Sequence, residues 1–311
     1  KFDCFNIKFT DTDKKQESMA DDAYYATKAA KHLDVRLNTI EVKPDLAKLL
    51  PKIVYHLDEP IGDSAAISTF LICDAARKAG VKVLLSGMGA DEIFCGYRRQ
   101  KALLFSKKYK RLPKLFRILI KNMVDILPVK LFGHGLRLVR WSKKFISFAE
   151  MPDEMAYRMS YSYYDKNELN QLLKENSSQI VDSLYQDHKS LFNSNYNNDV
   201  VNKMCFTDIN MFMNGLNLTY TDRSSMAASV EVRVPFIDKK LITKGMSIPG
   251  EFKFKNNESK YILKKIAEKL LPNKIIYRPK ASFGAPIRSW ISGDLRSMVD
   301  ECLSMAQIEK R

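Results

Sequence analysis

Long hydrophobic runs are absent from this 311-residue sequence. It contains no stretch of about 18 uncharged apolar residues, which excludes an ordinary transmembrane helix. The chain opens Lys-Phe-Asp-Cys, with charge inside the first apolar segment, so we expect no signal peptide. Apolar residues make up 45% of the sequence and charged residues 28%, a balance typical of globular proteins. The length is enough for one large or two small domains.

Cysteine and histidine are also scarce. The odd, dispersed cysteines lack the spacing of a zinc site or a disulfide framework, which predicts reduced thiols in a cytoplasmic protein. The histidines have no partner at nucleophile or metal spacing, so we expect them at the surface or at helix caps. These residues are Cys4, Cys73, Cys95, Cys205, Cys302, His32, His56, His134 and His188.

Positive charge is concentrated between Arg98 and Lys144, a segment that contains fifteen Lys and Arg residues and one acidic residue, Asp125. This segment carries nearly all of the formal net charge of +15. Interleaved apolar residues predict basic amphipathic helices that break at Pro113, Pro128 and a Gly-His-Gly turn. Two interpretations stay open: a solvated face over a buried stripe, or a surface that docks onto an acidic partner or an anionic membrane. No basic and aromatic strand motif supports nucleic-acid binding.

The first 100 residues alternate between strand and helix patterns. Strands are predicted around Phe5–Phe9 and over 35–42 and 81–85, and helices over 21–33 and 65–79. The apolar run Val81–Leu85 is typical of a strand buried on both faces. This order predicts a doubly wound parallel α/β sheet that binds ligands at the carboxyl ends of its strands. From about residue 101 to 311 the pattern is mostly helical.

A motif follows the Val81–Leu85 strand. Ser86-Gly87 ends the strand, the chain turns at Gly89, and a helix restarts with Asp91 and Glu92 in its first turn. Small residues here let a ligand approach the backbone, free N–H groups favour a phosphate, and Asp91 suits a magnesium ion that bridges phosphates. The alternative is an ordinary β–α turn whose acids balance the helix dipole.

Three further segments carry polar residues suited to a site. Glu231 and Arg233 alternate with apolar residues in an extended segment and share one face, either as an exposed ion pair or as the lining of a polar pocket. Lys260 begins a predicted helix over 259–271 and suits a bound phosphate, although a lysine-rich chain also tolerates a cation there. Lys280 lies in an Arg-Pro-Lys segment before a glycine turn, which suits an anion. Asp63-Ser64 is either a helix cap or a ligand contact.

Together these segments resemble the synthetase domain of glutamine-dependent asparagine synthetases. The resemblance rests on the order and spacing of the segments 85–97, 222–238, 259–264 and 278–286. It implies an adenine-nucleotide α-hydrolase-like fold and ATP-driven amide formation. A carboxylate would attack the α-phosphate of ATP to give an acyl-adenylate and pyrophosphate, and ammonia derived from glutamine would then release AMP.

The resemblance also implies roles for individual residues. Ile7, Ser86 and Gly87 would contact adenosine, and Asp91 would bind Mg²⁺ and pyrophosphate. Lys260 would stabilise phosphoryl charge during adenylation, Lys280 would help to hold pyrophosphate, and Glu231 and Arg233 would lie near the reaction centre. Residues 1–100 would form the nucleotide-binding part, and residues 101–311 would contribute Glu231, Lys260 and Lys280 to the same site.

The sequence departs from the family pattern in three respects. The pyrophosphate loop Ser-Gly-Gly-x-Asp-Ser and the glutaminase domain are not in this chain, so we expect a fragment or a truncated enzyme that adenylates poorly alone and does not hydrolyse glutamine. Met88 stands where asparagine synthetases carry glutamate, and the Thr/Arg element that recognises aspartate is not matched in 63–69. The alternatives to asparagine formation are amidation of a uronic acid sugar in surface-polysaccharide biosynthesis and a non-catalytic binding scaffold.

Overall fold

The computed structural model of the chain describes residues 1–10, 22–41, 45–131, 134–173, 178–194, 199–279 and 283–310. These residues group into two units, each assembled from segments that are distant in sequence. The first unit comprises 1–88, 214–235 and 264–311, and the second comprises 89–213 and 236–263. The division at residue 100 that the sequence suggests stays a prediction, whereas the packing separates the chain between Met88 and Gly89.

The first unit combines short strands with helices. The strands and helices expected in the first 100 residues are confirmed to within about two residues, and Gly80, with φ 82°, follows the end of α4 as expected. A further helix, α3, was not predicted. The elements are β1 (Asp3–Lys8), α2 (Asp22–Leu33), β2 (Arg36–Glu41), α3 (Leu46–Leu57), α4 (Ala65–Lys78), β3 (Val83–Leu85), α13 (Thr219–Ala227), β6 (Glu231–Arg233), α17 (Asn273–Ile276), α18 (Ile287–Ser292), α19 (Arg296–Cys302) and α20 (Met305–Ile308).

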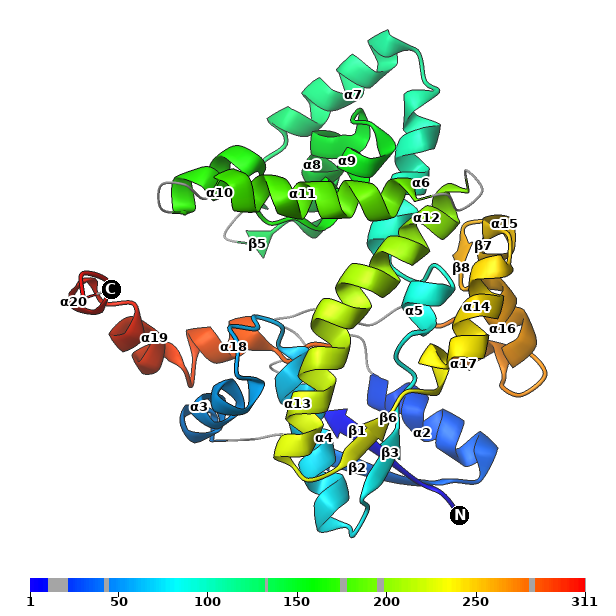
Figure 1. Cartoon of the computed structure of the whole chain (residues 1–311), viewed down its shortest axis with the longest axis vertical. Helices are drawn as coiled ribbons and strands as arrows, with labels where there is room; N and C mark the ends of the chain where they lie inside the picture. Colours follow the sequence, from blue (N-terminus) through cyan, green and yellow to red (C-terminus); the bar gives the residue numbers. More distant parts are fainter. Residues whose placement is uncertain are drawn as a thin grey trace. The chain divides into compact units, whose positions relative to one another are not determined.

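The strands of this unit pair in parallel, as the sequence predicts. β1 runs beside β2 with Ile7 opposite Ile40, and β3 runs beside β6 with Leu85 opposite Arg233 (Figure 1). Within the described residues each ladder has two strands. These short ladders give a mostly helical α/β architecture with small parallel sheets, and they do not show the doubly wound sheet that we expected.

One prediction about β3 is wrong. The apolar run indicated a strand buried on both faces, but Leu85 is 75% exposed and Val83 is also exposed. Leu84 and its neighbour Val232 point the other way and pack against the core. Because successive side chains alternate between the two faces of a strand, a ladder covered on one face leaves its remaining apolar residues in solvent.

The core of the first unit lies among β1, α3, α4 and α13. Helices α4 and α13 pack against each other, and Figure 1 shows them side by side. Phe9 packs edge-on against Trp290, with ring centroids 6.1 Å apart, which joins the N-terminal strand region to α18. The buried side chains include Phe9, Leu46, Ile53, Leu57, Ile67, Phe70, Cys73, Tyr220, Val230, Trp290 and Leu295.

The second unit is mainly helical and has its own core, which includes Cys95, Leu103, Phe148, Ala156, Tyr157, Phe192, Val201, Met204, Cys205 and Met246. Its elements are α5 (Ala90–Ile93), α6 (Arg98–Lys110), α7 (Lys114–Ile126), β4 (Lys130–Leu131), β5 (His134–Gly135), α8 (Arg137–Ala149), α9 (Asp153–Tyr161), α10 (Lys166–Leu172), α11 (Ser178–Asn193), α12 (Val200–Thr207), α14 (Lys239–Ser247), α15 (Gly250–Lys253), β7 (Phe254–Lys255) and β8 (Glu258–Ser259). Helix α16 (Tyr261–Ala267) and the π-helix Asp208–Leu218 continue from one unit into the other.

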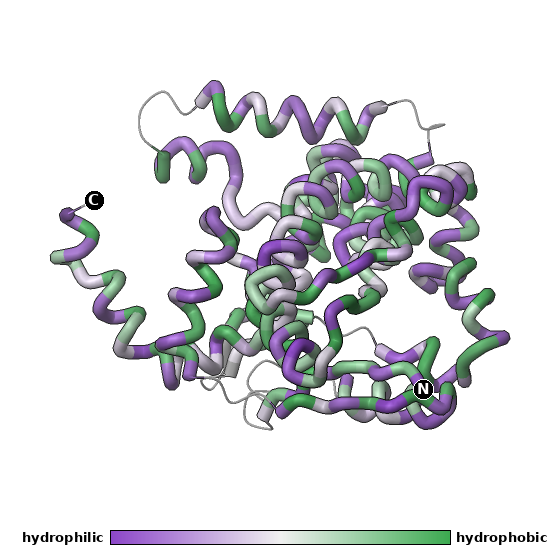
Figure 2. The backbone as a smooth tube through the Cα atoms, turned by 60° about the horizontal axis from the view of Figure 1, so that its bottom comes forward, coloured by the Kyte–Doolittle hydropathy of each residue, from purple (hydrophilic) through white to green (hydrophobic). Residues whose placement is uncertain are grey.

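The basic segment forms three of these helices. α6 ends before Pro113, which precedes α7, and α7 ends before Pro128, so the predicted helices and both proline breaks are confirmed. Hydrophilic and hydrophobic residues alternate along the helices of the chain (Figure 2). Among the described residues, no helix has both the length and the hydrophobicity needed to cross a bilayer. All five cysteines are free thiols.

Candidate active site

The motif after β3 adopts the predicted strand–turn–helix arrangement. The Ser86 amide donates to the Arg233 carbonyl at 2.9 Å, which extends the ladder by one bond, and the Ser86 hydroxyl accepts from the Met88 amide at 3.3 Å. Gly89 has φ 95°, and an added Cβ would lie 3.0 Å from Phe236, so glycine is required at this turn. Helix α5 then begins at Ala90 and is a single turn. So short a helix has little dipole, and any phosphate affinity must come from side chains.

Asp91 and Lys260 meet at the start of this helix. Lys260 Nζ lies 3.0 Å from Asp91 Oδ1, although the two residues come from motifs far apart in sequence. The Lys260 amide donates to the Phe94 carbonyl at 3.1 Å, which ties the backbone at residue 260 to α5. Lys260 itself has φ 55° and stands immediately before α16, which is shorter than the helix predicted over 259–271. Such a left-handed backbone is uncommon for a residue other than glycine.

Gly96 completes the local geometry of this pair. Its amide donates to the Asp91 carbonyl at 2.8 Å. An added Cβ at residue 96 would lie 1.9 Å from Asp91 Oδ1 and 2.4 Å from Lys260 Cε. Only glycine leaves room for the carboxylate and the ammonium group to lie side by side.

The Asp91–Lys260 pair suits a magnesium-bound phosphate. Both side chains are about one quarter exposed, at 27% and 26%, so a ligand can reach them. Within the part of the chain that the structure describes, no three His, Cys, Asp or Glu side chains cluster as a complete metal cage. Magnesium commonly takes one or two carboxylates and fills its remaining positions with substrate phosphates and water. Asp91 can serve as such a carboxylate, while Lys260 can pair with a phosphate oxygen.

Glu231 and Arg233 lie on one face of β6, as the alternation predicts. Arg233 Nε donates to Glu231 Oε1 at 2.8 Å, and both side chains are more than half exposed. The hydrogen bond from Arg233 lowers the pKa of Glu231 below its ordinary value. Of the two interpretations, the geometry of the chain itself corresponds to the exposed ion pair. A role beside a reaction centre stays a prediction.

The remaining predicted residues differ in what surrounds them. Ile7 is half-buried in β1 and packs against the core of the first unit. A Cβ added at Gly87 would meet no atom within 4 Å among the described residues, so packing does not demand glycine there. Asp63, one residue before the N-cap Ser64 of α4, accepts at Oδ1 from the amide of the first helical residue, Ala65, at 2.9 Å. Lys280 lies outside the described residues.

The structure therefore brings the predicted residues together in two groups. Asp91 and Lys260 form an ion pair within the second unit. Ser86 is joined to the backbone of Arg233, beside Glu231, within the first unit. Ser86 and Asp91 are separated by only four residues of chain.

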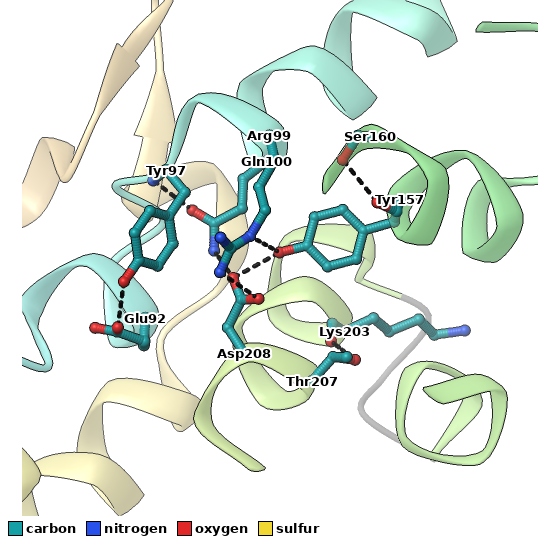
Figure 3. A network of polar contacts seen from close by, with 9 residues as sticks. All are labelled: Glu92, Tyr97, Arg99, Gln100, Tyr157, Ser160, Lys203, Thr207 and Asp208. Carbon is teal, nitrogen blue, oxygen red and sulfur yellow. Dashed lines mark hydrogen bonds and ion pairs between the residues drawn. The ribbon is translucent and has the colours of Figure 1, made fainter. Parts of the chain in front are cut away.

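A buried polar network in the second unit was missed by sequence reasoning (Figure 3). Asp208, 1% exposed, accepts from Arg99 at 2.9 Å, from Gln100 at 2.8 Å and from Tyr157 at 2.5 Å. Burial raises the pKa of Asp208, while the charge of Arg99 acts in the opposite direction. From the sequence, Arg99 was placed only within the basic segment, for which a solvated face was one of two interpretations. No sequence signal pairs it with an acid more than 100 residues away.

The network reaches the motif through Tyr97. Its hydroxyl donates to Glu92 Oε1, and its ring stacks on the Arg99 guanidinium, 4.0 Å from the centroid. Glu92 is 1% exposed, and burial raises its pKa above the ordinary 4.5. This contact connects α5, which carries Asp91, to the first turn of α6.

The histidine expectation also needs correction. His188 is 2% exposed rather than at the surface, and its Nδ1 lies 2.7 Å from Glu154 Oε1. Its ring stacks against Phe192, with centroids 6.3 Å apart. It is therefore a core histidine whose Nδ1 is paired with a carboxylate, and the sequence around it gave no sign of that partner.

Comparison with known proteins identifies the family to which this chain belongs. The family described as asparagine synthase matches residues 1–311, and the chain therefore belongs to the asparagine synthase family. Asparagine synthetase [glutamine-hydrolyzing] 1 of Bacillus subtilis is 33% identical over 261 residues, which cover 84% of this chain and 39% of that protein. A putative asparagine synthetase [glutamine-hydrolyzing] of Mycobacterium bovis is 31% identical over 252 residues, covering 79% of this chain and 36% of that protein.

A more distant relative carries a different name. Amidase chyE of Penicillium rubens is 22% identical over 328 residues, which cover 98% of this chain and 47% of that protein. The chain thus spans less than half the length of each of these three relatives.

Proposed function

We propose that this chain carries out the ATP-dependent half of an asparagine synthetase-like amide synthesis. A carboxylate oxygen attacks the α-phosphorus of ATP, which forms an acyl-adenylate and expels pyrophosphate. Ammonia, supplied from glutamine by a partner glutaminase domain, then attacks the acyl carbon and expels AMP. The observation that carries the proposal is the Asp91–Lys260 pair, because it brings together two of the segments on which the resemblance to the family rests, 85–97 and 259–264.

Each residue in the proposal has a defined task. Asp91 holds Mg²⁺, which neutralises phosphate charge when bound, and Lys260 pairs with a phosphate oxygen as negative charge develops. Ser86 and Gly87 contact adenosine. The open space at Gly87 supports this role. Packing within the described residues does not require glycine there, and the missing side chain leaves room for a ligand to approach the backbone.

Four further residues complete the proposed set. Ile7 contacts adenosine from β1, and Lys280 helps to hold pyrophosphate. Glu231 and Arg233 line the reaction centre, where the carboxylate orients a nucleophile and the guanidinium holds an anion. Their exposure on β6 leaves both side chains accessible to a ligand. A cytoplasmic location is proposed with this chemistry, because the five cysteines are free thiols.

Pyrophosphate release tests the proposal directly. In the full-length protein that carries this chain, addition of the carboxylate acceptor is expected to release pyrophosphate from ATP. Lys260→Met is expected to reduce this release at least about a hundredfold, since it removes a charge that acts on the developing phosphoryl charge. The matched control is Lys244→Met, at an exposed position of α14 in the same unit, which should keep wild-type activity. ATP binding without any acceptor-dependent release across a panel of carboxylates would instead favour the non-catalytic scaffold.

The acceptor is proposed to be a carboxylate other than free aspartate, and a uronic acid sugar is the leading alternative. Met88 supports this proposal because a thioether can neither accept a proton nor pair with an ammonium group. Met88 is half-buried, packs against the core of the first unit, and lies 3.6 Å from the Thr221 hydroxyl. Position 88 therefore lies in partly buried surroundings that suit an apolar side chain, and it is not an exposed position where any side chain would fit.

A further inference from the structure

Helix α7 presents an apolar face to solvent. Leu115, Leu119, Met123 and Ile126 recur at three- and four-residue spacing on one side of the helix, and they are 59% to 82% exposed. Phe116 borders this face and is 60% exposed. A soluble helix normally turns such a stripe toward a core, so a contiguous exposed one marks an interaction surface.

Contacts on the opposite side hold α7 in this orientation. Arg117 Nη1 lies 2.9 Å from Glu150 Oε1, and the Tyr109 hydroxyl donates to the Arg117 carbonyl at 3.0 Å. At the other end of the helix, Lys143 Nζ donates to the Asp125 carbonyl at 2.9 Å. Because polar contacts fasten both ends to α6 and α8, the apolar face cannot turn inward without breaking them.

The charge around this face selects its partner. The segment Arg98–Lys144 contains fifteen Lys and Arg residues and one acid, so a second copy of the chain would meet strong like-charge repulsion. Helix α8 adds exposed Leu138 and Trp141, and Arg137 lies over the Trp141 ring, 4.4 Å from its centroid. Exposed apolar and aromatic side chains bordered by cations match the boundary between headgroups and acyl chains of an anionic bilayer.

A hollow lined mainly by α6 and α8 also combines cations with aromatic side chains. Its volume is about 810 Å³. Arg98 lies over the Trp141 ring, 5.3 Å from its centroid, Lys108 lies over the Phe105 ring at 5.7 Å, and all four residues line the hollow. None of the described residues that line it is acidic. Burial, followed by the nearby charge of Arg137, lowers the pKa of Arg98. An anionic group arriving at this hollow would relieve that repulsion between cations.

We propose that the surface formed by α6, α7 and α8, here termed the α6–α8 face, docks onto an anionic membrane. The apolar side chains of α7 enter the headgroup boundary, and the surrounding lysines and arginines bind lipid phosphates. The protein lies on the bilayer and does not cross it. This inference does not depend on the proposed amide synthesis, because none of its residues belongs to the candidate site.

Vesicle flotation with the full-length protein tests the proposal. Vesicles of phosphatidylcholine with phosphatidylglycerol are expected to carry the protein, vesicles of phosphatidylcholine alone are not, and added salt should weaken the binding. The double variant Leu119→Asp/Met123→Asp is expected to reduce binding at least about tenfold, because it places charge on the inserted face. Ile180→Asp, at a similarly exposed apolar position on α11, is the matched control and should bind normally.

Several results would overturn the proposal. One is the absence of binding by the wild-type protein to anionic vesicles, which requires no variant. Another is an equal loss in the α7 variant and the Ile180 control. Binding to an acidic polypeptide through Leu119 and Met123, with no binding to vesicles, would assign the face to a protein partner. Circular dichroism confirms folding of both variants. Pyrophosphate release measured without vesicles should be unchanged in them, which separates this test from that of the proposed function.

Discussion

Gly96 lies directly against the carboxylate of Asp91: a Cβ at residue 96 would sit 1.9 Å from Asp91 Oδ1. We predict that Gly96→Ala displaces Asp91 or Lys260 and lowers acceptor-dependent pyrophosphate release at least about tenfold, at a stability cost of about 1–3 kcal/mol from overpacking. Steady-state kinetics and urea denaturation measure the two effects. Gly215→Ala is the control, because a Cβ there meets nothing within 4 Å among the described residues. Wild-type activity in Gly96→Ala would contradict the geometry of the pair.

Gly87 should behave differently from Gly96. An added Cβ at residue 87 contacts none of the described residues within 4 Å, so Gly87→Ala should unfold at the same urea concentration as the wild-type protein. If the nucleotide approaches this backbone, the methyl group should raise KM for ATP at least about tenfold. An unchanged KM would remove residue 87 from the nucleotide site, whereas a loss of stability would show that glycine serves the fold.

Asp208 is predicted to be the most sensitive polar position of the second unit. Asp208→Asn leaves Arg99, 11% exposed, without its carboxylate, and should lower the free energy of unfolding by about 3–5 kcal/mol. Tyr157→Phe removes two hydrogen bonds from the same network, the one donated to Asp208 and the one accepted from Arg99 Nε, and should lower it by only about 2 kcal/mol. Urea titrations of both variants and of the double variant provide the comparison. Equal effects of the two substitutions would show that Asp208 is not needed to compensate the buried charge of Arg99.

Glu92 should make stability depend on pH. Burial raises the pKa of this carboxyl above its ordinary 4.5, so the folded chain binds the proton more tightly than the unfolded chain does. The free energy of unfolding therefore falls as the pH rises from 4.5 to the raised pKa, and it levels off above that pKa. Glu92→Gln is expected to make this fall smaller, since the buried Asp208 contributes a fall of the same sign, and to be the more stable form at neutral pH. A steeper fall in the variant, measured by urea denaturation across this pH range, would show that folding lowers the pKa of Glu92 and does not raise it.

Met88 is predicted to limit the use of aspartate. Met88→Glu restores a carboxylate at the position where asparagine synthetases carry one, and it should increase aspartate-dependent pyrophosphate release in the full-length protein. Met88→Gln is the control, because it adds polarity without a charge. Because Met88 packs against the core, both variants should be somewhat less stable than the wild type, which urea denaturation will reveal. Efficient asparagine formation by the wild-type protein would show that the acceptor proposal is wrong.

Local patterns predicted the short elements well and the long-range contacts poorly. The ends of α4 and the turn at Gly89 follow from residues adjacent in the sequence, whose backbone preferences are strong. The pairing of β3 with β6 joins residues nearly 150 positions apart, and nothing in either strand specifies its partner. For the same reason the sequence indicated an apolar β3 but not which of its side chains would stay exposed.

The candidate site shows the same contrast. Asp91 and Lys260 were each singled out from their own motif, and the structure adds that they are ion-paired. His188 was misjudged and Arg99 was not singled out, because a core histidine and a buried cation look like surface residues until their partners, Glu154 and Asp208, are known. Burial of a charged group depends on tertiary partners rather than on its neighbours in the chain.

The ladder between β3 and β6 is only three residue pairs long, and it carries Glu231 and Arg233 on the same side. Deleting one residue between Ala228 and Glu231 would slide β6 by one position and turn both charges toward the hydrophobic interior. Such a shift is expected to destabilise the fold and to displace Glu231 and Arg233 together. Natural variation in the length of this segment is therefore expected to be absent, even where individual side chains vary freely.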